Sequence, residues 1–262
     1  MAAMDIFEFR DMFSGVRSAA FVGNASSVLF WDNGKIIDSY DMIVRFNRAY
    51  VHGLEEKIGR KTDVLVSNNL NSLKLSPSPT KTLCPKCVVT FVKPKGGLDT
   101  GPLKEWVGDI PHVITLEPDI FGVGSINRTR SLTMGTYSLY TFLRLFQFEK
   151  LFLTGFTMFG IVPGGSEKYY EREKNQRAGH FHDLDQEAII FRTILRQYNG
   201  ELRMSPEVER LVNGGASLDS NPFKHKRSTA KIYHFLSLKF LRLGFFFRRC
   251  AEKNNWLYND QR

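Results

Sequence analysis

The sequence predicts an α/β fold, in which a Rossmann-like and mostly parallel sheet is flanked by helices. Short apolar or β-branched runs recur along the chain, and polar or helical stretches separate them. Strands that are apolar on both faces are typical of a parallel sheet covered by helices. The length of 262 residues, 42% of them hydrophobic, allows an adequate core. The runs expected to form strands are residues 19–24, 41–47, 63–69, 87–92, 112–117 and 150–156.

Two of these expected strands end in polar or glycine-bearing turns, GNASS and TGFTMFG. Ligands of open α/β sheets collect at the carboxyl ends of strands, which makes Ser26, Gly155 and Phe156 candidate ligand-binding residues. Neither turn matches the GxGxxG dinucleotide fingerprint, and the chain contains no GxxxxGK[ST] phosphate-binding loop. The site is therefore expected to hold another kind of ligand.

A helix is predicted over residues 133–148, where Tyr137, Tyr140 and Leu143 recur at helical spacing. Thr133 is placed to cap its N-terminus. A helix start with small residues is a ready anion site, because its free N–H groups and its dipole face outward. An ordinary buried helix with an ordinary cap is the alternative.

The glycine-rich and charged residues 157–179 have no sustained period, so we interpret them as a long loop. This loop contains Tyr169 and Tyr170. A phenolic hydroxyl can donate to a leaving phosphate without carrying a charge that would retain the product. Simple packing is the alternative role of the pair.

The segment AGHFHDLDQEA, residues 178–188, places two histidines and alternating carboxylates just before an apolar helical pattern. Asp183 and Asp185 could hold a divalent cation, but the first turn of a helix favours carboxylates without any metal. A histidine beside carboxylates can accept a proton near neutral pH, which makes His180 and His182 candidate bases. Solvated loop histidines are the alternative.

The net charge of +9 is concentrated near the C-terminus, where residues 224–253 contain nine Lys or Arg and a single acidic residue. We therefore predict a Rossmann-like domain over residues 1–222 and a basic aromatic tail over residues 223–262. Aromatic residues at helical spacing between basic ones are typical of a helix that lies on a membrane surface. Nucleic-acid binding and burial against the domain are the alternatives, although a phosphate-binding surface does not need the sequence LGFFF.

The chain as given is expected to be soluble and cytoplasmic. No run approaches the roughly 18 apolar residues of a membrane span, and the acidic, amphipathic N-terminus does not resemble a secretory signal. The three cysteines are too few for a disulfide framework and favour a reducing compartment. Cys84 and Cys87 form one CPKC pair, which we interpret as a surface turn rather than a metal or redox site.

Four short patterns in residues 19–66 are similar to the large sialylmotif of the animal-type sialyltransferase family. They are V-G-N, I-D-S-x-D, R-x-N and a closing G-x-[KR]-T, in this order and at compatible spacing. Residues 131–156 resemble the small sialylmotif, residues 168–171 the third motif, and residues 182–187 the very small motif, His-x4-Glu.

The resemblance implies a metal-independent, inverting transfer of sialic acid, or a similar keto-sugar, from a CMP donor to an acceptor hydroxyl. No cofactor is implied, because the CMP-sugar is itself a substrate. His182 matches the family's general base and Glu187 a supporting carboxylate, while Tyr169 or Tyr170 and the helix start would hold the phosphate and the sugar carboxylate. The matches to donor-binding positions are Asn24, Asn47, Thr133 and Gly135, with Met134 where the family has threonine.

Bacterial sialyltransferases, a related fold group, resemble the chain in a second alignment. This alignment nominates His180 as the base and adds Asn68 as a donor-site asparagine. The family's lumenal members also carry a disulfide between the large and small motifs, and the matching positions here are Ala19 and Phe146. Between the two histidines, we expect His182 to be the base.

Two alternatives remain open. Met134 and Lys168 depart from the family pattern, which permits another CMP-linked keto-sugar, such as CMP-Kdo, as the donor. The basic tail permits a catalytically silent membrane or nucleic-acid binding protein. We favour an enzyme that works in the cytoplasm, peripherally at the inner membrane face, on a glycan or glycolipid acceptor and without a nucleic-acid partner.

Overall fold

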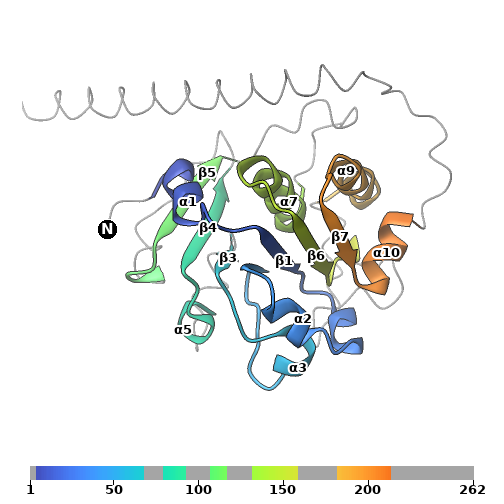
Figure 1. The fold of residues 1–262 in the computed structure, drawn as a ribbon, viewed down its shortest axis with the longest axis horizontal. Coiled ribbons are helices and arrows are strands. Elements are labelled where there is room, and N and C mark those ends of the chain that lie inside the picture. Colours follow the sequence, from blue (N-terminus) through green and yellow to red (C-terminus); the bar gives the residue numbers. More distant parts are fainter. Residues whose placement is uncertain (1–3, 68–78, 93–106, 117–131, 159–181, 214–262) are drawn as a thin grey trace, which may run out of the picture. The chain divides into compact units, whose positions relative to one another are not determined.

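The computed structural model describes residues 4–67, 79–92, 107–116, 132–158 and 182–213 (Figure 1). The predicted domain boundary at residue 222 and the basic aromatic tail lie outside these residues. Among the helices that are described, none has both the length and the apolar character needed to cross a membrane.

The predicted parallel sheet is confirmed, and the described residues form seven strands of it in the order β5-β4-β3-β2-β1-β6-β7. Every pairing between neighbouring strands is parallel. The six expected runs each contain a strand, and β7 is the one that hydrophobic patterning missed. Its residues alternate between exposed and half-buried, as suits the edge of a sheet. The strands are β1 (Ser18–Val22), β2 (Met42–Phe46), β3 (Val64–Val66), β4 (Cys87–Val92), β5 (His112–Leu116), β6 (Lys150–Thr154) and β7 (Glu201–Met204).

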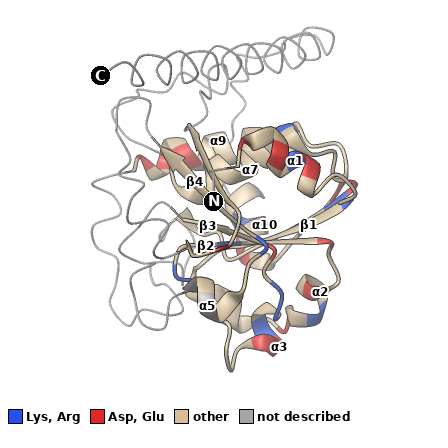
Figure 2. Cartoon of the chain, turned by 90° about the vertical axis from the view of Figure 1, so that its left-hand side faces the viewer, with Lys and Arg blue, Asp and Glu red and all other residues tan. Residues whose placement is uncertain are grey.

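Helices cover both faces of the sheet, which explains why its central strands are buried on both faces and mostly apolar. In Figure 2 the helices α1, α7 and α9 lie on one side of the sheet, and α2, α3 and α5 lie on the other. The helix α10 packs against β6, β7 and α9. The helices are α1 (Ile6–Met12), the 3-10 helix η1 (Ser26–Phe30), α2 (Gly34–Asp38), α3 (Glu55–Ile58), α5 (Pro79–Leu83), α7 (Met134–Leu145), α9 (Leu184–Arg196) and α10 (Pro206–Asn213).

The central strand β1 contributes to the core on both of its faces. On one face the Phe21 ring lies 5.8 Å from the Phe142 ring of α7. On the other face Ala20 and Val22 pack in a buried cluster with Ile37 of α2. Burying both faces at about 25 cal/mol per Å² of apolar surface makes this strand a main source of stability.

The loop between α3 and β3 is held by Arg45, a fully buried residue of β2. Its Nη2 donates to the carbonyl oxygens of Ile58 and Gly59 at 2.6 and 3.2 Å, and its Nε donates to Thr62 Oγ1 at 3.1 Å. A buried guanidinium is tolerated only when such acceptors replace water. The R-x-N pattern thus begins with a residue that supports the fold.

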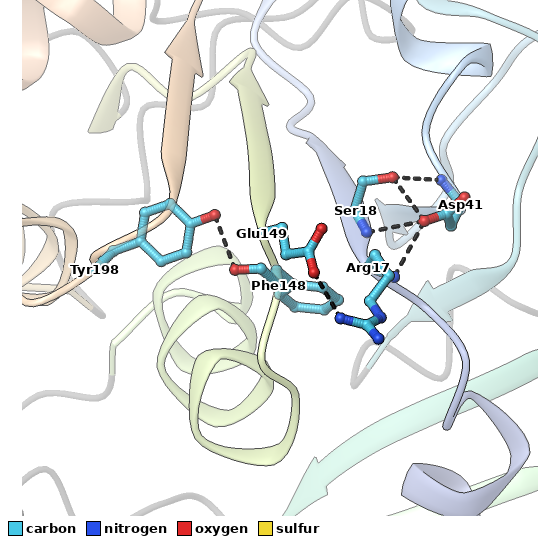
Figure 3. Close-up of polar contacts among 6 residues, drawn as sticks. All are labelled: Arg17, Ser18, Asp41, Phe148, Glu149 and Tyr198. Atoms are coloured by element: carbon cyan, nitrogen blue, oxygen red, sulfur yellow. Dashed lines mark hydrogen bonds and ion pairs between the residues drawn. The ribbon is translucent and has the colours of Figure 1, made fainter.

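The amino ends of β1 and β6 are joined by polar contacts (Figure 3). Asp41 accepts hydrogen bonds from Ser18 N at 2.9 Å and from Arg17 N at 3.1 Å. Arg17 Nη1 lies 2.5 Å from Glu149 Oε1, and Glu149 N donates to Arg17 O at 2.7 Å. Because both side chains of the ion pair are exposed, the pair contributes at most about 1 kcal/mol.

Apolar packing fills the two positions that match the lumenal disulfide. Ala19 is fully buried within β1, and Phe146 ends α7 with only 7% of its surface exposed. The Phe146 ring lies 5.7 Å from the ring of Phe9 in α1. The segments that carry these positions are therefore held by the core.

Cys84 is exposed, and Cys87 is buried within β4. Cys87 begins the strand that was predicted over residues 87–92, and Cys84 lies in the short connection before it. Burial raises the pKa of the Cys87 thiol to about 12. Since the reactive species is the thiolate, this burial disfavours a redox role.

Candidate active site

The candidate site lies where the order of strands reverses. The strand β1 pairs with β2 on one side and with β6 on the other. Chain segments leaving β1 and β6 therefore run to opposite halves of the sheet, which is the arrangement that opens a ligand crevice at the carboxyl ends of the strands. Gly23 and Asn24 follow β1 at this edge, and Gly155 and Phe156 follow β6.

The turns after β1 and β6 touch through glycine backbone. Gly23 N donates to Thr154 O at 2.7 Å, and Ala25 N donates to Gly155 O at 3.2 Å. A Cβ atom on Gly23 would lie 2.2 Å from Gly155 O. Gly155 itself has a φ of +74°, in the left-handed region that glycine adopts without strain. Both positions thus require glycine for this close approach.

Asn24 and Asn47, predicted as donor-binding residues, come together at this edge. Asn24 Nδ2 donates to the carbonyl oxygen of Phe46, the residue before Asn47, at 2.9 Å. Asn47 has a φ of +53°, a left-handed conformation that asparagine tolerates better than most side chains. Its Oδ1 is buried and has no hydrogen-bond partner among the described residues, so it can accept a hydrogen bond from a ligand.

The start of α7 faces the turn after β6. A Cβ atom on Gly135 would lie 2.6 Å from Phe156 Cε1, so the ring packs directly on this glycine. The position of Thr133 as the N-cap is confirmed. Its hydroxyl makes no capping bond to its own helix, however, and donates instead to Glu187 of α9. Met134, the first residue of the helix, is buried.

The carboxyl group of Glu187 joins the starts of α7 and α9. Its Oε1 accepts hydrogen bonds from Thr133 N at 2.9 Å, from Thr136 Oγ1 at 2.5 Å and from the Thr133 hydroxyl. Its Oε2 is buried without a hydrogen-bond partner in the described part of the chain. Glu187 is completely buried, and this burial raises the pKa of its carboxyl, while the threonine hydrogen bonds and the nearby charge of His182 oppose the rise.

His182 stands just before α9, close enough to Glu187 to influence its titration. Its side chain is partly exposed, as a group that exchanges protons with a substrate must be. An imidazole beside a carboxyl group is a suitable general base, because the carboxylate stabilises the imidazolium that forms. The structure thus joins the His182–Glu187 motif to Thr133, which belongs to a different motif of the sequence.

The carboxylates between His182 and Glu187 behave as helix-start residues. Asp183 is the N-cap of α9, and its side chain accepts a hydrogen bond from Gln186 N at 3.2 Å. Asp185 lies exposed in the first turn. Within the described ranges, no group of three or more His, Cys, Asp or Glu is arranged to hold a metal ion. Capping accounts for Asp183 without a cation, and metal independence stays a prediction.

Four of the predicted site residues lie outside the described residues, namely His180, Tyr169, Tyr170 and Asn68. Ser26 is described and begins η1, directly after the turn that contains Asn24. The roles assigned to all of these residues remain predictions.

Sequence reasoning missed Glu207, a buried carboxylate at the start of α10 that contacts the turn after β6. Its Oε1 accepts from Gly155 N at 2.9 Å, and its Oε2 accepts from Trp31 Nε1 at 2.9 Å. An acidic residue in the first turn of a helix looks ordinary in sequence, because the helix dipole favours it there. No spacing signal in the sequence links Glu207 to residues more than fifty positions away.

Two substitutions of Glu187 distinguish the contribution of its hydrogen bonds to stability from that of its charge. We expect Glu187→Ala to lower the free energy of unfolding by about 3 kcal/mol, because it leaves three donors of Thr133 and Thr136 unsatisfied in the interior. Glu187→Gln keeps an oxygen acceptor for these donors, so its loss should be clearly smaller. Urea denaturation at neutral pH measures both values, and equal losses would contradict the hydrogen-bond assignment.

The pH dependence of the same variants follows from the raised pKa. Stability linked to Glu187 is complete below the ordinary pKa of a glutamate and is lost as the pH rises through the higher folded-state value. The advantage of the native chain over Glu187→Gln should therefore shrink from about pH 4.5 upward. A difference that grows with pH over this range would show that the pKa of Glu187 is lowered.

Residues 6–91 match the family model described as glycosyltransferase family 29 (sialyltransferase). These residues run from α1 to β4 and include Asn24, Arg45 and Asn47. Over residues 6–91, the chain is therefore similar to the sialyltransferase family. Within the matched segment, Arg45 supports the fold, while Asn24 and Asn47 lie at the carboxyl edge of the sheet.

Curated relatives match a short part of the chain. The beta-galactoside alpha-2,6-sialyltransferase 2 of Rattus norvegicus is 42% identical over 55 residues, which are 21% of this chain and 10% of that protein. The Homo sapiens protein of the same name is 40% identical over 55 residues, with the same coverage. The match thus spans about a tenth of the length of these sialyltransferases.

Among solved structures, a mammalian sialyltransferase is similar with a TM-score of 0.47 and 19% identity, covering 72% of this chain and 69% of that one. The same type of enzyme in complex with Gal-beta-1-3GalNAc-ortho-nitrophenol gives a TM-score of 0.44 at 19% identity, with the same coverage.

Proposed function

We propose that the chain is an inverting glycosyltransferase that moves sialic acid from CMP-sialic acid to a hydroxyl of an acceptor glycan. The observation that carries this proposal is the contact between the His182–Glu187 motif and the start of α7, beside the strand edge that bears Asn24 and Asn47. The family match over residues 6–91 supports the class of reaction.

In the proposed reaction, His182 removes the proton of the acceptor hydroxyl as the oxygen attacks the anomeric carbon. The bond between this carbon and the phosphate oxygen of CMP breaks on the opposite face, which inverts the configuration. Asn24 and Asn47 bind the donor, and the free N–H groups at the start of α7 favour an anionic group of the donor. Tyr169 or Tyr170 is proposed to donate a hydrogen bond to the leaving phosphate.

Metal independence is part of the proposal, because CMP has only one phosphate and Asp183 is already used as a helix cap. With CMP-sialic acid as donor, release of CMP should be the same with excess EDTA as without it. The measurement is chromatography of CMP after incubation, with a denatured sample as the control. Complete loss under EDTA that Mn²⁺ restores would support a metal site at Asp183 and Asp185 instead.

A second candidate donor is another CMP-linked keto-sugar such as CMP-Kdo. Met134 favours it, since this buried thioether occupies the first turn of α7, where the family has a hydroxyl. A thermal-shift panel of CMP, CMP-sialic acid and CMP-Kdo separates the donors, because a ligand at 100 times its dissociation constant stabilises the folded state by about 2.7 kcal/mol. The donor with the largest shift above CMP alone is the substrate.

We also propose that the enzyme works at the cytoplasmic membrane face on a lipid-linked glycan, with residues 223–262 attached to anionic lipid. Nine basic residues between positions 224 and 253 support this, since each adds about 1 kcal/mol near an anionic leaflet. The test is sedimentation of the full chain with phosphatidylserine vesicles, neutral vesicles and oligonucleotides. Binding to oligonucleotides without CMP-sugar turnover would support the non-catalytic alternative.

A further inference from the structure

The buried carboxylate of Glu207 receives four hydrogen bonds from three separate segments. Its Oε1 accepts from Gly155 N at 2.9 Å and Thr154 Oγ1 at 3.2 Å, both at the end of β6. The same oxygen accepts from Ser205 Oγ at 2.5 Å, and Oε2 accepts from Trp31 Nε1 at 2.9 Å. Glu207 is only 3% exposed, and all four donors are neutral groups.

These contacts fix both ends of the segment that contains Asn24. At its beginning, Ala25 N donates to the carbonyl oxygen of Gly155, whose own N–H is held by Glu207. At its end, Trp31 donates directly to the same carboxylate. One side chain of α10 thus determines the position of residues 24–31 relative to β6.

The start of α7 depends on the same contact. Phe156 follows Gly155 in the chain, and its ring packs on Gly135 and lies 5.8 Å from the ring of Phe46. A shift of the Gly155 turn would therefore be transmitted both to Asn24 and to the start of α7. These are the two sides of the proposed donor site.

We propose that Glu207 is a positioning residue for the CMP donor, an inference that rests on the proposed function. It touches neither the acceptor nor the reacting atoms in this scheme. It acts through the Gly155 turn and through Trp31, so its loss should weaken nucleotide binding more than it slows the step at His182.

The test uses Glu207→Gln and Trp31→Phe, alone and together, with CMP affinity measured by calorimetry. The side-chain amide of Glu207→Gln has only one oxygen. When this oxygen accepts the hydrogen bond from Gly155 N, the NH₂ group faces the indole N–H of Trp31, so that two donors oppose each other. We expect CMP to bind about tenfold more weakly to this variant and about threefold more weakly to Trp31→Phe. The double variant should recover part of the loss, because Trp31→Phe removes the opposed donor.

Asp63→Asn is the matched control, because Asp63 is also a buried carboxylate and accepts from Ile43 N at 2.9 Å near the amino end of β3. It should lower thermal stability and leave CMP affinity unchanged. Transfer assays on the same variants should show a raised donor KM with kcat within about threefold for Glu207→Gln, as lost ground-state binding requires.

Amide hydrogen exchange provides a readout that needs no ligand. Glu207→Gln should speed exchange in peptides that cover residues 23–31 and 151–157, and Asp63→Asn should not. Unchanged CMP affinity and exchange in Glu207→Gln would overturn the positioning role. Failure of the native chain to bind CMP at all would refute the proposed function itself, and the donor role of Glu207 with it.

Discussion

Replacement of His182 by asparagine is expected to lower kcat for sialyl transfer by about 10³-fold, the usual contribution of a positioned general base. The reason is that no other group beside the start of α7 is proposed to accept the proton of the acceptor hydroxyl. Affinity for CMP should change by less than about threefold, because asparagine preserves much of the size of the side chain and Asn24 and Asn47 are untouched. Steady-state kinetics with CMP-sialic acid over pH 5 to 9 measure kcat, and inhibition by added CMP in the same assay measures the affinity for CMP.

The controls for this variant are two other histidines. His52 is 89% exposed at its side chain, in the loop before α3, so His52→Asn should leave kcat unchanged. His180→Asn tests the competing alignment. The assignment of the base to His182 is wrong if His180→Asn loses activity while His182→Asn keeps it. In that case His182→Asn should also keep the acidic limb of the pH profile of kcat.

Gly155→Ala is expected to lower the free energy of unfolding by about 4 kcal/mol and to abolish CMP binding in the fraction that folds. The added Cβ would lie 2.4 Å from Val28 Cγ1 and 2.5 Å from Gly23 O. The residue would also have to keep a φ of +74°. Relief of this overlap requires the turns after β1 and β6 to separate, which displaces Asn24 from the site.

Gly53→Ala is the matched control for backbone strain alone. Gly53 has a φ of +77°, but nothing lies within 4 Å of the position of its Cβ. This variant should therefore lose only about 1 kcal/mol, the cost of a left-handed conformation with a side chain. Chemical denaturation compares the two variants, and equal losses would show that contact between the two turns has no energetic importance.

Local patterns in the sequence were sufficient to predict six strands of the sheet and the helices α7 and α9. Central strands such as β1 and β6 are apolar on both faces, and this composition is specific to a buried parallel sheet. The helix α9 was indicated by its cap, Asp183, and by the apolar period that follows it. The edge strand β7 was not predicted, because its half-exposed residues form no continuous apolar run.

The site could be predicted only as separate pieces. Asn24, Asn47 and His182 were predicted as site residues from their motifs, since motif spacing is local. Contacts across many residues leave no such signal, which is why the bond of Thr133 to Glu187, 54 positions away, was not foreseen. Glu207 was not predicted for the same reason, because its hydrogen-bond partners come from three different segments of the chain.

A structure of the chain with a non-hydrolysable CMP-sialic acid analogue would test the proposed mechanism directly. We expect the nucleotide across the carboxyl ends of β1 and β6, in contact with Asn24 and Asn47. The imidazole of His182 should face the anomeric carbon from the side opposite the phosphate, with space between them for an acceptor hydroxyl. An analogue bound away from this edge, or with His182 directed away from the sugar, would contradict the proposed mechanism.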